Sequence, residues 1–364
     1  VFAAASSREQ EGCSGSLAGL VKAGVLTSVL TILGAAFLFG TVGSTDLWEI
    51  AGRLQEVLHA ERGSVPITAK AGYVVAIGLL FSGMLLRMEA FPFHGWTCRT
   101  HASIRIPFAS FLSAFMKTGA FAAALRILWI LFIRHSREYE ENFPLIAIIS
   151  TVAVLTVLAG TWKAFFEKDF RKFMACSCVA HTGLLLMGVS LCGRQGIEPV
   201  MVYLGIYAVM TFGAFFIFGA AGGRSPGAGL DVLSGLHGRS PVLAGSMTVI
   251  LLSLTGVPVT GGFMAKYLLF QALLGHSKPL FHIVAAIGIA ASVLSAVTYG
   301  RIIHGMYFKP GPETSTAAPA AVRPPVAAAV VALMVAAVLI ATGVYWKPLQ
   351  QAAVSAMMII EFQY

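Results

Sequence analysis

Charged side chains inside long apolar stretches are the residues of this sequence that could do chemistry. Lys117 lies in the run from Phe111 to Ala120, and apolar residues extend roughly ten positions on either side of it. An ionised side chain at the centre of a bilayer costs about 2.5–3.5 kcal/mol on insertion scales, so it needs a partner, water or a function. A partly desolvated lysine releases its proton more readily than an exposed one, which suits Lys117 to proton transfer.

Further ionisable residues lie beside interruptions that are rich in Gly and Pro. Lys266 follows Pro258 by eight residues, and it is the second candidate for proton transfer. Arg87 and Glu89 directly precede the interruption at Ala90 to Trp96. Because arginine stays protonated in proteins, Arg87 can bias charge but cannot carry a proton. We therefore predict that Arg87 and Glu89 act as an electrostatic gate.

Two histidines fall in the same apolar stretches. His94 lies in the first interruption, and His181 lies in the sequence Ala180-His181-Thr182-Gly183. A lone histidine inside a membrane is more often a hydrogen-bonded packing residue than a proton carrier. Its unperturbed pKa of about 6.5 nevertheless suits it to relay protons near neutral pH. Both histidines are therefore candidate relays.

The composition indicates that these residues belong to a membrane protein. Of the 364 residues, 57% are hydrophobic and only 11% are charged, and the mean hydropathy is +0.81. A soluble domain carries roughly 25% charged residues, so most side chains here must face something other than water. The net charge of +9 is spread over short loops, and no basic stripe is interleaved with exposed aromatic residues, so we expect no nucleic-acid partner.

Apolar runs long enough to cross a bilayer predict an all-α, polytopic transmembrane helical bundle with about nine spans. We expect a polar N-terminal segment over 1–16, a transmembrane domain over 17–346 and a C-terminal surface helix or tail over 347–364. A short surface helix is expected within 45–70. The predicted spans are 17–43, 70–92, 104–134, 143–165, 171–193, 197–221, 240–273, 282–307 and 324–345.

Two of these spans are broken. The interruptions are caused by Pro92 in the second span and by Gly256, Pro258, Gly261 and Gly262 in the seventh. Proline removes a backbone donor, and backbone groups freed inside a membrane are tolerated only within protein or beside a water-filled cavity. Broken helices in two parts of one chain indicate inverted repeats around an ion site near the bilayer midplane.

The cysteines do not indicate a redox or metal centre. There are five, and no two form a Cys-x-x-Cys pair. We expect no disulfide framework and no Fe–S or zinc site, and we interpret Cys176 and Cys178 as small packing residues. No histidine pair has metal-ligand spacing next to a carboxylate, so the prediction is no metal and no cofactor on this chain.

The residues around the breaks resemble those of a known family, the antiporter-like membrane subunits of respiratory complex I (NADH:ubiquinone oxidoreductase). The string Arg87-x4-Pro92-Phe93-His94-Gly95-Trp96 is similar to the family's Lys-x4-Pro-Phe-His-x-Trp segment. Lys117, thirty residues beyond Arg87, matches the family's second buried lysine. The stretch 166–183 resembles the family's loop and helix with its Tyr-Ser-Ser…His-x-Gly pattern. The most specific match is 252–266, which is similar to the broken helix of these subunits. Among them, a lysine at 266 is typical of chain 2, called chain N in bacteria.

This resemblance implies a proton-translocating subunit that moves protons through its buried lysines and is driven by redox chemistry in other subunits. NADH, FMN, Fe–S clusters and quinone would then be bound by those other subunits. The partners would be other membrane subunits of the complex and membrane lipids. The implied location is the mitochondrial inner membrane, with a bacterial plasma membrane as the alternative. The larger set of basic loops predicts an N-terminus on the electrically negative side, which is the matrix side in mitochondria.

The sequence departs from the family pattern at several positions. Arg87 replaces the family's first buried lysine, and Glu89, where a small residue is usual, could pair with Arg87. The acidic turn that normally follows the tryptophan is replaced by 97–101. The match also begins after the helix that would supply a buried glutamate to the first lysine. We therefore predict a split subunit, in which a separate chain supplies the missing N-terminal helices and a buried Glu near Arg87.

Two other functions remain open for the sequence. An autonomous cation/proton antiporter of the same ancestry would carry its own acidic ion-binding residues, but apart from Glu89 the acidic residues lie nearly all in loops. A structural scaffold subunit that has lost pumping is favoured by Arg87 and by the missing glutamate.

Overall fold

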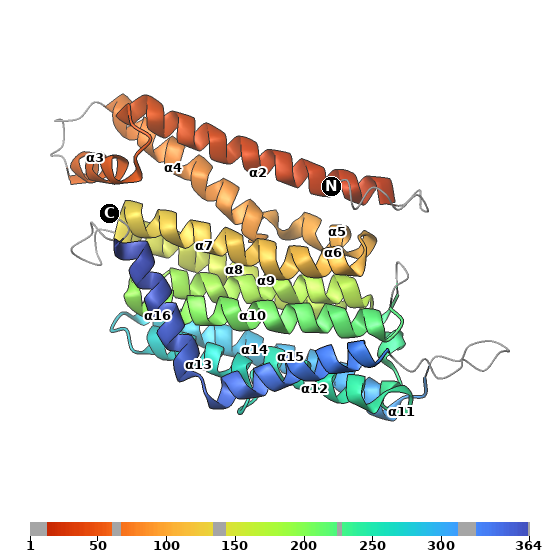
Figure 1. Cartoon of the computed structure of the whole chain (residues 1–364). Helices are drawn as coiled ribbons and strands as arrows, with labels where there is room; N and C mark the ends of the chain where they lie inside the picture. Colours follow the sequence, from red (N-terminus) through yellow and green to blue (C-terminus); the bar gives the residue numbers. More distant parts are fainter. Residues whose placement is uncertain (1–12, 60–66, 134–142, 224–227, 312–324, 363–364) are drawn as a thin grey trace.

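The chain is a bundle of long helices that lie roughly alongside one another, from α2 at one edge to α12 and α15 at the other (Figure 1). The computed structural model describes residues 13–59, 67–133, 143–223, 228–311 and 325–362. The helices up to the middle of the chain are α2 (Cys13–Val42), α3 (Leu47–His59), α4 (Ile67–Met88), η1 (Phe93–Trp96), α5 (Thr97–Ser103), α6 (Ile106–Phe111), η2 (Leu112–Met116), α7 (Lys117–Leu128), η3 (Trp129–Ile133) and α8 (Phe143–Phe166). The remaining helices are α9 (Phe170–Val189), α10 (Arg194–Ala220), η5 (Leu230–Leu233), α11 (Leu236–Arg239), α12 (Pro241–Thr255), α13 (Gly261–Leu274), α14 (Pro279–Phe308), α15 (Val326–Val344) and α16 (Lys347–Phe362).

Among the described residues, eight segments are long and apolar enough to cross a membrane, so the chain is a multi-pass membrane protein. Each of them falls on one of the spans expected from the sequence. The remaining expected span, 240–273, is divided by its break into α12 and α13, and each half is too short to cross alone. The eight segments are Gly19–Val42, Ala71–His101, Ile106–Leu131, Pro144–Phe166, Phe170–Val189, Arg194–Ala220, Pro279–Phe308 and Val326–Val344.

The regions outside the membrane spans also carry the expected helices. α3 is amphipathic, with Ile50 and Leu54 buried and Glu49 and Arg53 exposed, as expected of a surface helix. α16 crosses the outside of the bundle obliquely (Figure 1), and Gln350 on it donates a hydrogen bond to Glu198 on α10. Of the predicted polar segment 1–16, residues 1–12 lie outside the described part of the chain, and α2 begins at Cys13.

α9 forms the centre of the bundle, since its span is 94% buried. Even Arg171, near its start, is only 1% exposed, and its guanidinium donates to the backbone oxygens of Ile104 and Gly223 at 3.0 and 3.1 Å. Burial on nearly all sides explains why α9 has no polar stripe facing outward, because all of its side chains except that of Lys172 are buried. The helices that carry the candidate residues are arranged around it.

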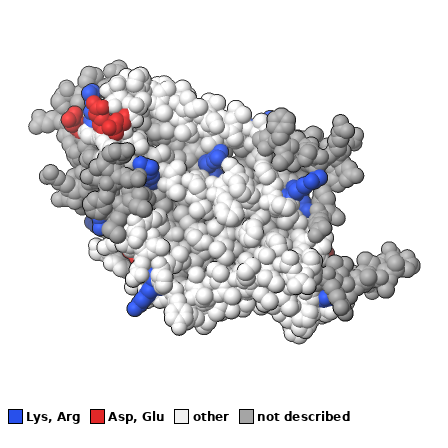
Figure 2. Space-filling view, in the orientation of Figure 1, with Lys and Arg blue, Asp and Glu red and all other residues white. Residues whose placement is uncertain are grey.

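One face of the bundle is largely uncharged. Figure 2 shows this face, on which Lys and Arg occur at isolated places, while the acidic side chains gather at the end where α3 lies. Lys22, Arg126 and Arg301 are exposed, as expected of side chains that extend toward lipid headgroups. The guanidinium of Arg301 also lies 4.1 Å from the centre of the Phe165 ring.

Candidate functional site

The first break begins where α4 ends, and Glu89 forms its first residue. The N–H of Glu89 donates to Leu86 O at 3.2 Å, and the N–H of Ala90 donates to Leu85 O at 2.9 Å. These two bonds form a Schellman motif, which places one residue in the left-handed region, and Glu89 has a φ of +63°. Glycine is the residue that usually occupies this position, so a glutamate here is held in a strained conformation.

The backbone groups that the first break frees are satisfied by neighbouring helices. Thr182 of α9 donates from its hydroxyl to Met88 O at 3.1 Å, and the N–H of Phe91 donates to the Thr156 hydroxyl of α8 at 3.0 Å. Pro92 follows directly and precedes η1, so the break lies at the predicted position. An interruption at this depth is tolerated because it is enclosed by protein.

Lys117 pairs with Glu89. Its Nζ lies 2.7 Å from Glu89 Oε2 and donates to Cys178 O of α9 at 3.1 Å, and both charged side chains are buried. Lys117 directly follows the π-helical turn η2, an irregularity that the sequence analysis did not predict and that is frequent at functional sites. A second partner of Lys117 is the ring of Tyr207, whose centre is 6.0 Å from Nζ.

The predicted pairing of Glu89 with Arg87 is wrong. Arg87 is exposed, whereas the left-handed turn directs Glu89 inward to Lys117. Side chains two positions apart at a helix end do not face each other, which explains the difference. Arg87 still lines the same cavity as Glu89 and Lys117, a space of about 60 Å³ that α2 closes with residues such as Gly24 and Thr27.

The second break uses the same backbone motif with different side chains. The N–H of Gly256 donates to Ser253 O at 3.0 Å, the N–H of Val257 donates to Leu252 O at 3.0 Å, and Gly256 has a φ of +90°. Ser253 also accepts the N–H of Gly262, at the start of α13, with its hydroxyl at 3.0 Å. A Cβ on Gly262 would lie 1.8 Å from Ser253 O, so the two half-helices approach closely only because this residue is glycine.

The other predicted break residues lie where the sequence placed them. Pro258 is exposed within the turn between α12 and α13. Gly261 begins α13, and a Cβ there would lie 2.4 Å from the Thr342 hydroxyl of α15. The turn therefore contacts α15 closely on one side and is open on the other.

Lys266 has no carboxylate beside it among the described residues, and its ammonium is held by the break itself. Its Nζ donates to Leu254 O at 2.9 Å and to Thr255 O at 2.8 Å, two carbonyls at the end of α12. The side chain is 6% exposed and lies at the inner wall of a groove of about 690 Å³ between α13 and α14. Tyr267, Gln271 and Ser292 line the same groove.

Buried polar side chains of α9, α10 and α14 form hydrogen bonds with one another. His181 Nδ1 is 2.8 Å from the Tyr203 hydroxyl, and both Lys117 and Lys266 lie within electrostatic range of His181. Ser177 and Tyr299 share a hydrogen bond of 2.5 Å. In the described part of the chain, no hydrogen bond joins His181 to either lysine. These polar side chains therefore form separate hydrogen-bonded pairs and no continuous chain to the lysines.

Sequence reasoning did not select these tyrosines or His101. His101 is fully buried, with Nδ1 2.8 Å from Thr97 O and Nε2 2.6 Å from the Ser113 hydroxyl in η2. Tyr207 donates its hydroxyl to Ser113 O at 3.2 Å. The sequence could have marked these residues as candidates, because each carries a hydroxyl or imidazole group inside an apolar span. Side-chain type alone, however, does not show which of these groups lie near the lysines.

His94 lies in η1 and contacts a different partner. Its Nε2 is 2.8 Å from Lys163 Nζ, at the end of α8, and its ring stacks on Phe91 with centroids 5.8 Å apart. Lys163 is exposed while His94 is buried. His94 is therefore placed between an exposed amine and the interior of the first break.

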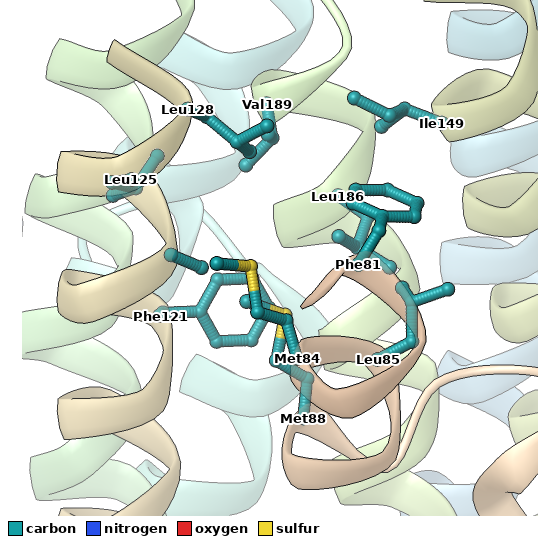
Figure 3. A pocket seen from close by; sticks show the side chains of 11 residues that line it. Phe81, Met84, Leu85, Met88, Phe121, Leu125, Leu128, Ile149, Leu186 and Val189 are labelled. Atoms are coloured by element: carbon teal, nitrogen blue, oxygen red, sulfur yellow. The ribbon is translucent and has the colours of Figure 1, made fainter. Parts of the chain in front are cut away.

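Apolar side chains of α4 and α7 fill the interior of the bundle on the side of Lys117 away from η1. Figure 3 shows Met84 and Met88 of α4 facing Phe121 of α7, with Leu125 and Leu128 further along α7. The space between them is about 10 Å³ and is lined by apolar residues only. This layer, which we call the apolar seal, extends about three turns from Lys117; its space is at the lower limit for a single water molecule, and its lining offers that water no polar partner.

These features define a class of protein: a polytopic helical membrane protein with buried amines beside two broken helices, an arrangement suited to ion translocation. A family model described as "NADH:quinone oxidoreductase/Mrp antiporter, TM" matches residues 5–295. The chain therefore belongs to the NADH:quinone oxidoreductase/Mrp antiporter family.

Bacterial proteins are among the curated relatives of this chain. It is 31% identical over 328 residues to NADH-quinone oxidoreductase subunit N 2 of Sorangium cellulosum, which covers 89% of this chain and 62% of the relative. It is 32% identical over 310 residues to NADH-quinone oxidoreductase subunit N of Desulfovibrio desulfuricans, which covers 82% of this chain and 59% of the relative. The chain thus spans about three fifths of the length of these relatives.

Solved structures share the fold. A chain of the Mrp complex from Dietzia sp. superposes with a TM-score of 0.79 at 22% identity, over 95% of this chain and 68% of that one. A chain of respiratory complex I from Thermus thermophilus superposes with a TM-score of 0.75 at 23% identity, over 95% of this chain and 70% of that one. The predicted fold class and the predicted family resemblance are confirmed. The absence of a cofactor or metal on this chain stays a prediction.

Proposed function

We propose that this chain is a proton-translocating membrane-arm subunit of an NADH:quinone oxidoreductase, driven by redox chemistry in other subunits. The names of its relatives support the complex, and the observation that carries the mechanism is the buried ion pair of Glu89 with Lys117 at the first break. A buried pair at 2.7 Å can exchange a proton internally, because transfer from the ammonium to the carboxylate leaves both groups neutral in a medium that disfavours charge.

Glu89 and Lys117 form the first proton station. Arg87 at the same cavity keeps a fixed positive charge, which stabilises the ionised carboxylate of Glu89 and opposes the ammonium of Lys117. The cavity of about 60 Å³ has space for water beside the pair. A proton can therefore reach or leave the pair without a large movement of the helices. This assigns Arg87 the gating role and gives Glu89 a direct role in proton transfer.

Lys266 forms the second station and works differently. Its ammonium is stabilised by the carbonyls of Leu254 and Thr255, which remain in place when the proton leaves. The groove between α13 and α14 gives it contact with the outside of the bundle. The charges of the two stations repel each other through a poorly screening interior, so protonation of one favours release from the other. His181, which is hydrogen-bonded to Tyr203 and within electrostatic range of both lysines, is proposed as the relay between the stations, with water required to bridge the remaining steps.

The apolar seal gives the first station a direction. Protons cannot pass between Met88, Phe121 and Leu125, so the path to Glu89 runs along the η1 side, where His94 meets the exposed Lys163. His94 is thus proposed as the relay on the access side of the first station.

The proposed surroundings follow from the family. The proposed partners are other membrane subunits of the complex, together with membrane lipids. NADH, FMN, Fe–S clusters and quinone are assigned to those other subunits. Because the named relatives are bacterial, the proposed location is a bacterial plasma membrane, ahead of the mitochondrial inner membrane. The N-terminus on the negative side stays a prediction.

The test is the number of protons moved per electron in membranes that contain the assembled complex. Lys117→Ala and Lys266→Ala should each lower this ratio, and the exposed Lys22→Ala should leave it unchanged as the matched control. An unchanged ratio in both variants, with the complex assembled, would contradict the proposal and favour the structural scaffold. Sodium- or potassium-driven proton movement without electron transfer would instead favour the autonomous antiporter.

A further inference from the structure

Two cysteines from distant parts of the sequence meet at the first break. Cys98 of α5 and Cys176 of α9 have their Sγ atoms 2.7 Å apart, although 78 positions separate them in the chain. A covalent S–S bond is about 2.05 Å long, so only a small displacement separates this contact from a disulfide. Both thiols are free in the structure.

The two thiols differ in access. Cys98 is partly exposed, whereas Cys176 is 2% exposed. Lys163 and Glu167, at the end of α8, lie within electrostatic range of Cys98. Cys98 is thus the thiol that a small polar reagent can reach, and Cys176 is placed behind it.

We propose that Cys98 and Cys176 are a redox modification site that closes to a reversible disulfide when a hydroperoxide oxidises Cys98. The Cys98 sulfur attacks the O–O bond of hydrogen peroxide, takes one oxygen as a sulfenic acid, and releases water. The Cys176 sulfur then attacks the Cys98 sulfur, the S–O bond breaks, and the hydroxyl leaves as a second water with the Cys176 proton. Two thiols lose two electrons in total, and the peroxide gains them; a dithiol reverses the change.

The disulfide would fix the second half of the broken helix to the centre of the bundle. α9 supplies the carbonyl of Cys178 to Lys117 and the hydroxyl of Thr182 to the last turn of α4. A covalent link from α5 to Cys176 therefore restrains the segment that holds the first proton station. This consequence rests on the proposed function: oxidation should slow proton translocation, while the link itself does not depend on that function.

The test starts from membranes that contain the assembled complex. They are treated with hydrogen peroxide, free thiols are blocked with N-ethylmaleimide, and unreduced digests are analysed by mass spectrometry. The expected product is a Cys98–Cys176 linked peptide that dithiothreitol removes and that is absent from Cys98→Ser and Cys176→Ser. Cys192 is the internal control, because burial raises the pKa of its thiol to about 12 and keeps it protonated and slow to react.

Each outcome decides one part of the inference. If Cys98 and Cys176 are both recovered as blocked free thiols after peroxide, or if Cys98 links to Cys178 instead, the site is wrong. Linkage that leaves the rate of proton translocation unchanged overturns the regulatory consequence. The proposed function is tested separately, because Lys117→Ala in reduced membranes reports on pumping when no disulfide is present.

Discussion

The two breaks share a backbone motif and differ in how they hold a buried amine. Each ends its first half-helix in a Schellman motif, with Glu89 in the left-handed position at one and Gly256 at the other. At the first break the side chain of that residue becomes the counter-ion of Lys117. At the second break there is no side chain, and two backbone carbonyls receive Lys266. The carboxylate of Glu89 therefore neutralises the charge of Lys117, whereas only the dipoles of two backbone carbonyls stabilise the ammonium of Lys266.

The two breaks also differ in access. The cavity at the first is about 60 Å³ and has the apolar seal on one side, while the groove at the second is about 690 Å³ and reaches the bundle surface. A charge that water can reach needs less compensation from the protein, which is consistent with a counter-ion only at the enclosed station.

The largest expected effect is on stability when the ion pair is cut. Glu89→Gln leaves Lys117 as an uncompensated buried charge, which should destabilise the chain by about 3–5 kcal/mol. Lys266→Met removes an amine without stranding a charge and should cost only about 1–2 kcal/mol. The measurement is the free energy of unfolding of the detergent-solubilised chain. The double variant Glu89→Gln/Lys117→Met should recover most of the loss; equal losses in the two single variants would erase the distinction between the breaks.

An intermediate effect is expected on proton leak. Leu125→Asn places an amide in the apolar seal, where it recruits water, so passive proton flow through vesicles should rise several-fold. Leu274→Asn changes the lining of the second groove, where the side chain is already 51% exposed, and should leave the leak at its original level. A leak that is the same for the two variants would show that the seal does not separate the stations from one side of the membrane.

The smallest expected effect concerns the shared motif. Glu89→Gly and Glu89→Ala both remove the carboxylate, but glycine accepts a φ of +63° without strain, so the Gly variant should be more stable by about 1–2 kcal/mol. Gly256→Ala should cost a similar amount at the second break. Gly245→Ala in α12 is the control, because its Cβ would meet nothing within 4 Å, and it should not destabilise. No difference between the two Glu89 variants would argue against a strained glutamate.

Local sequence predicted most of the framework. Spans, breaks and the amphipathic α3 follow from hydropathy, proline and glycine, because a bilayer forces each apolar run of sufficient length into a helix. The candidate residues Lys117 and Lys266 were found in the same way, since a charge in an apolar run is visible without a structure. The pairing of Glu89 was predicted wrongly because the sequence placed it beside Arg87, its neighbour in the chain.

Local sequence was enough to predict amines beside unwound backbone, because a charged residue within an apolar run and the proline and glycines that interrupt a helix are both visible in neighbouring positions. The partners of each amine depend on how the helices pack. The direction of Glu89 depends on one left-handed residue, and the contact of Cys98 with Cys176 depends on how α5 lies against α9. Such contacts join distant residues through helix packing, and the local pattern of a sequence does not encode them.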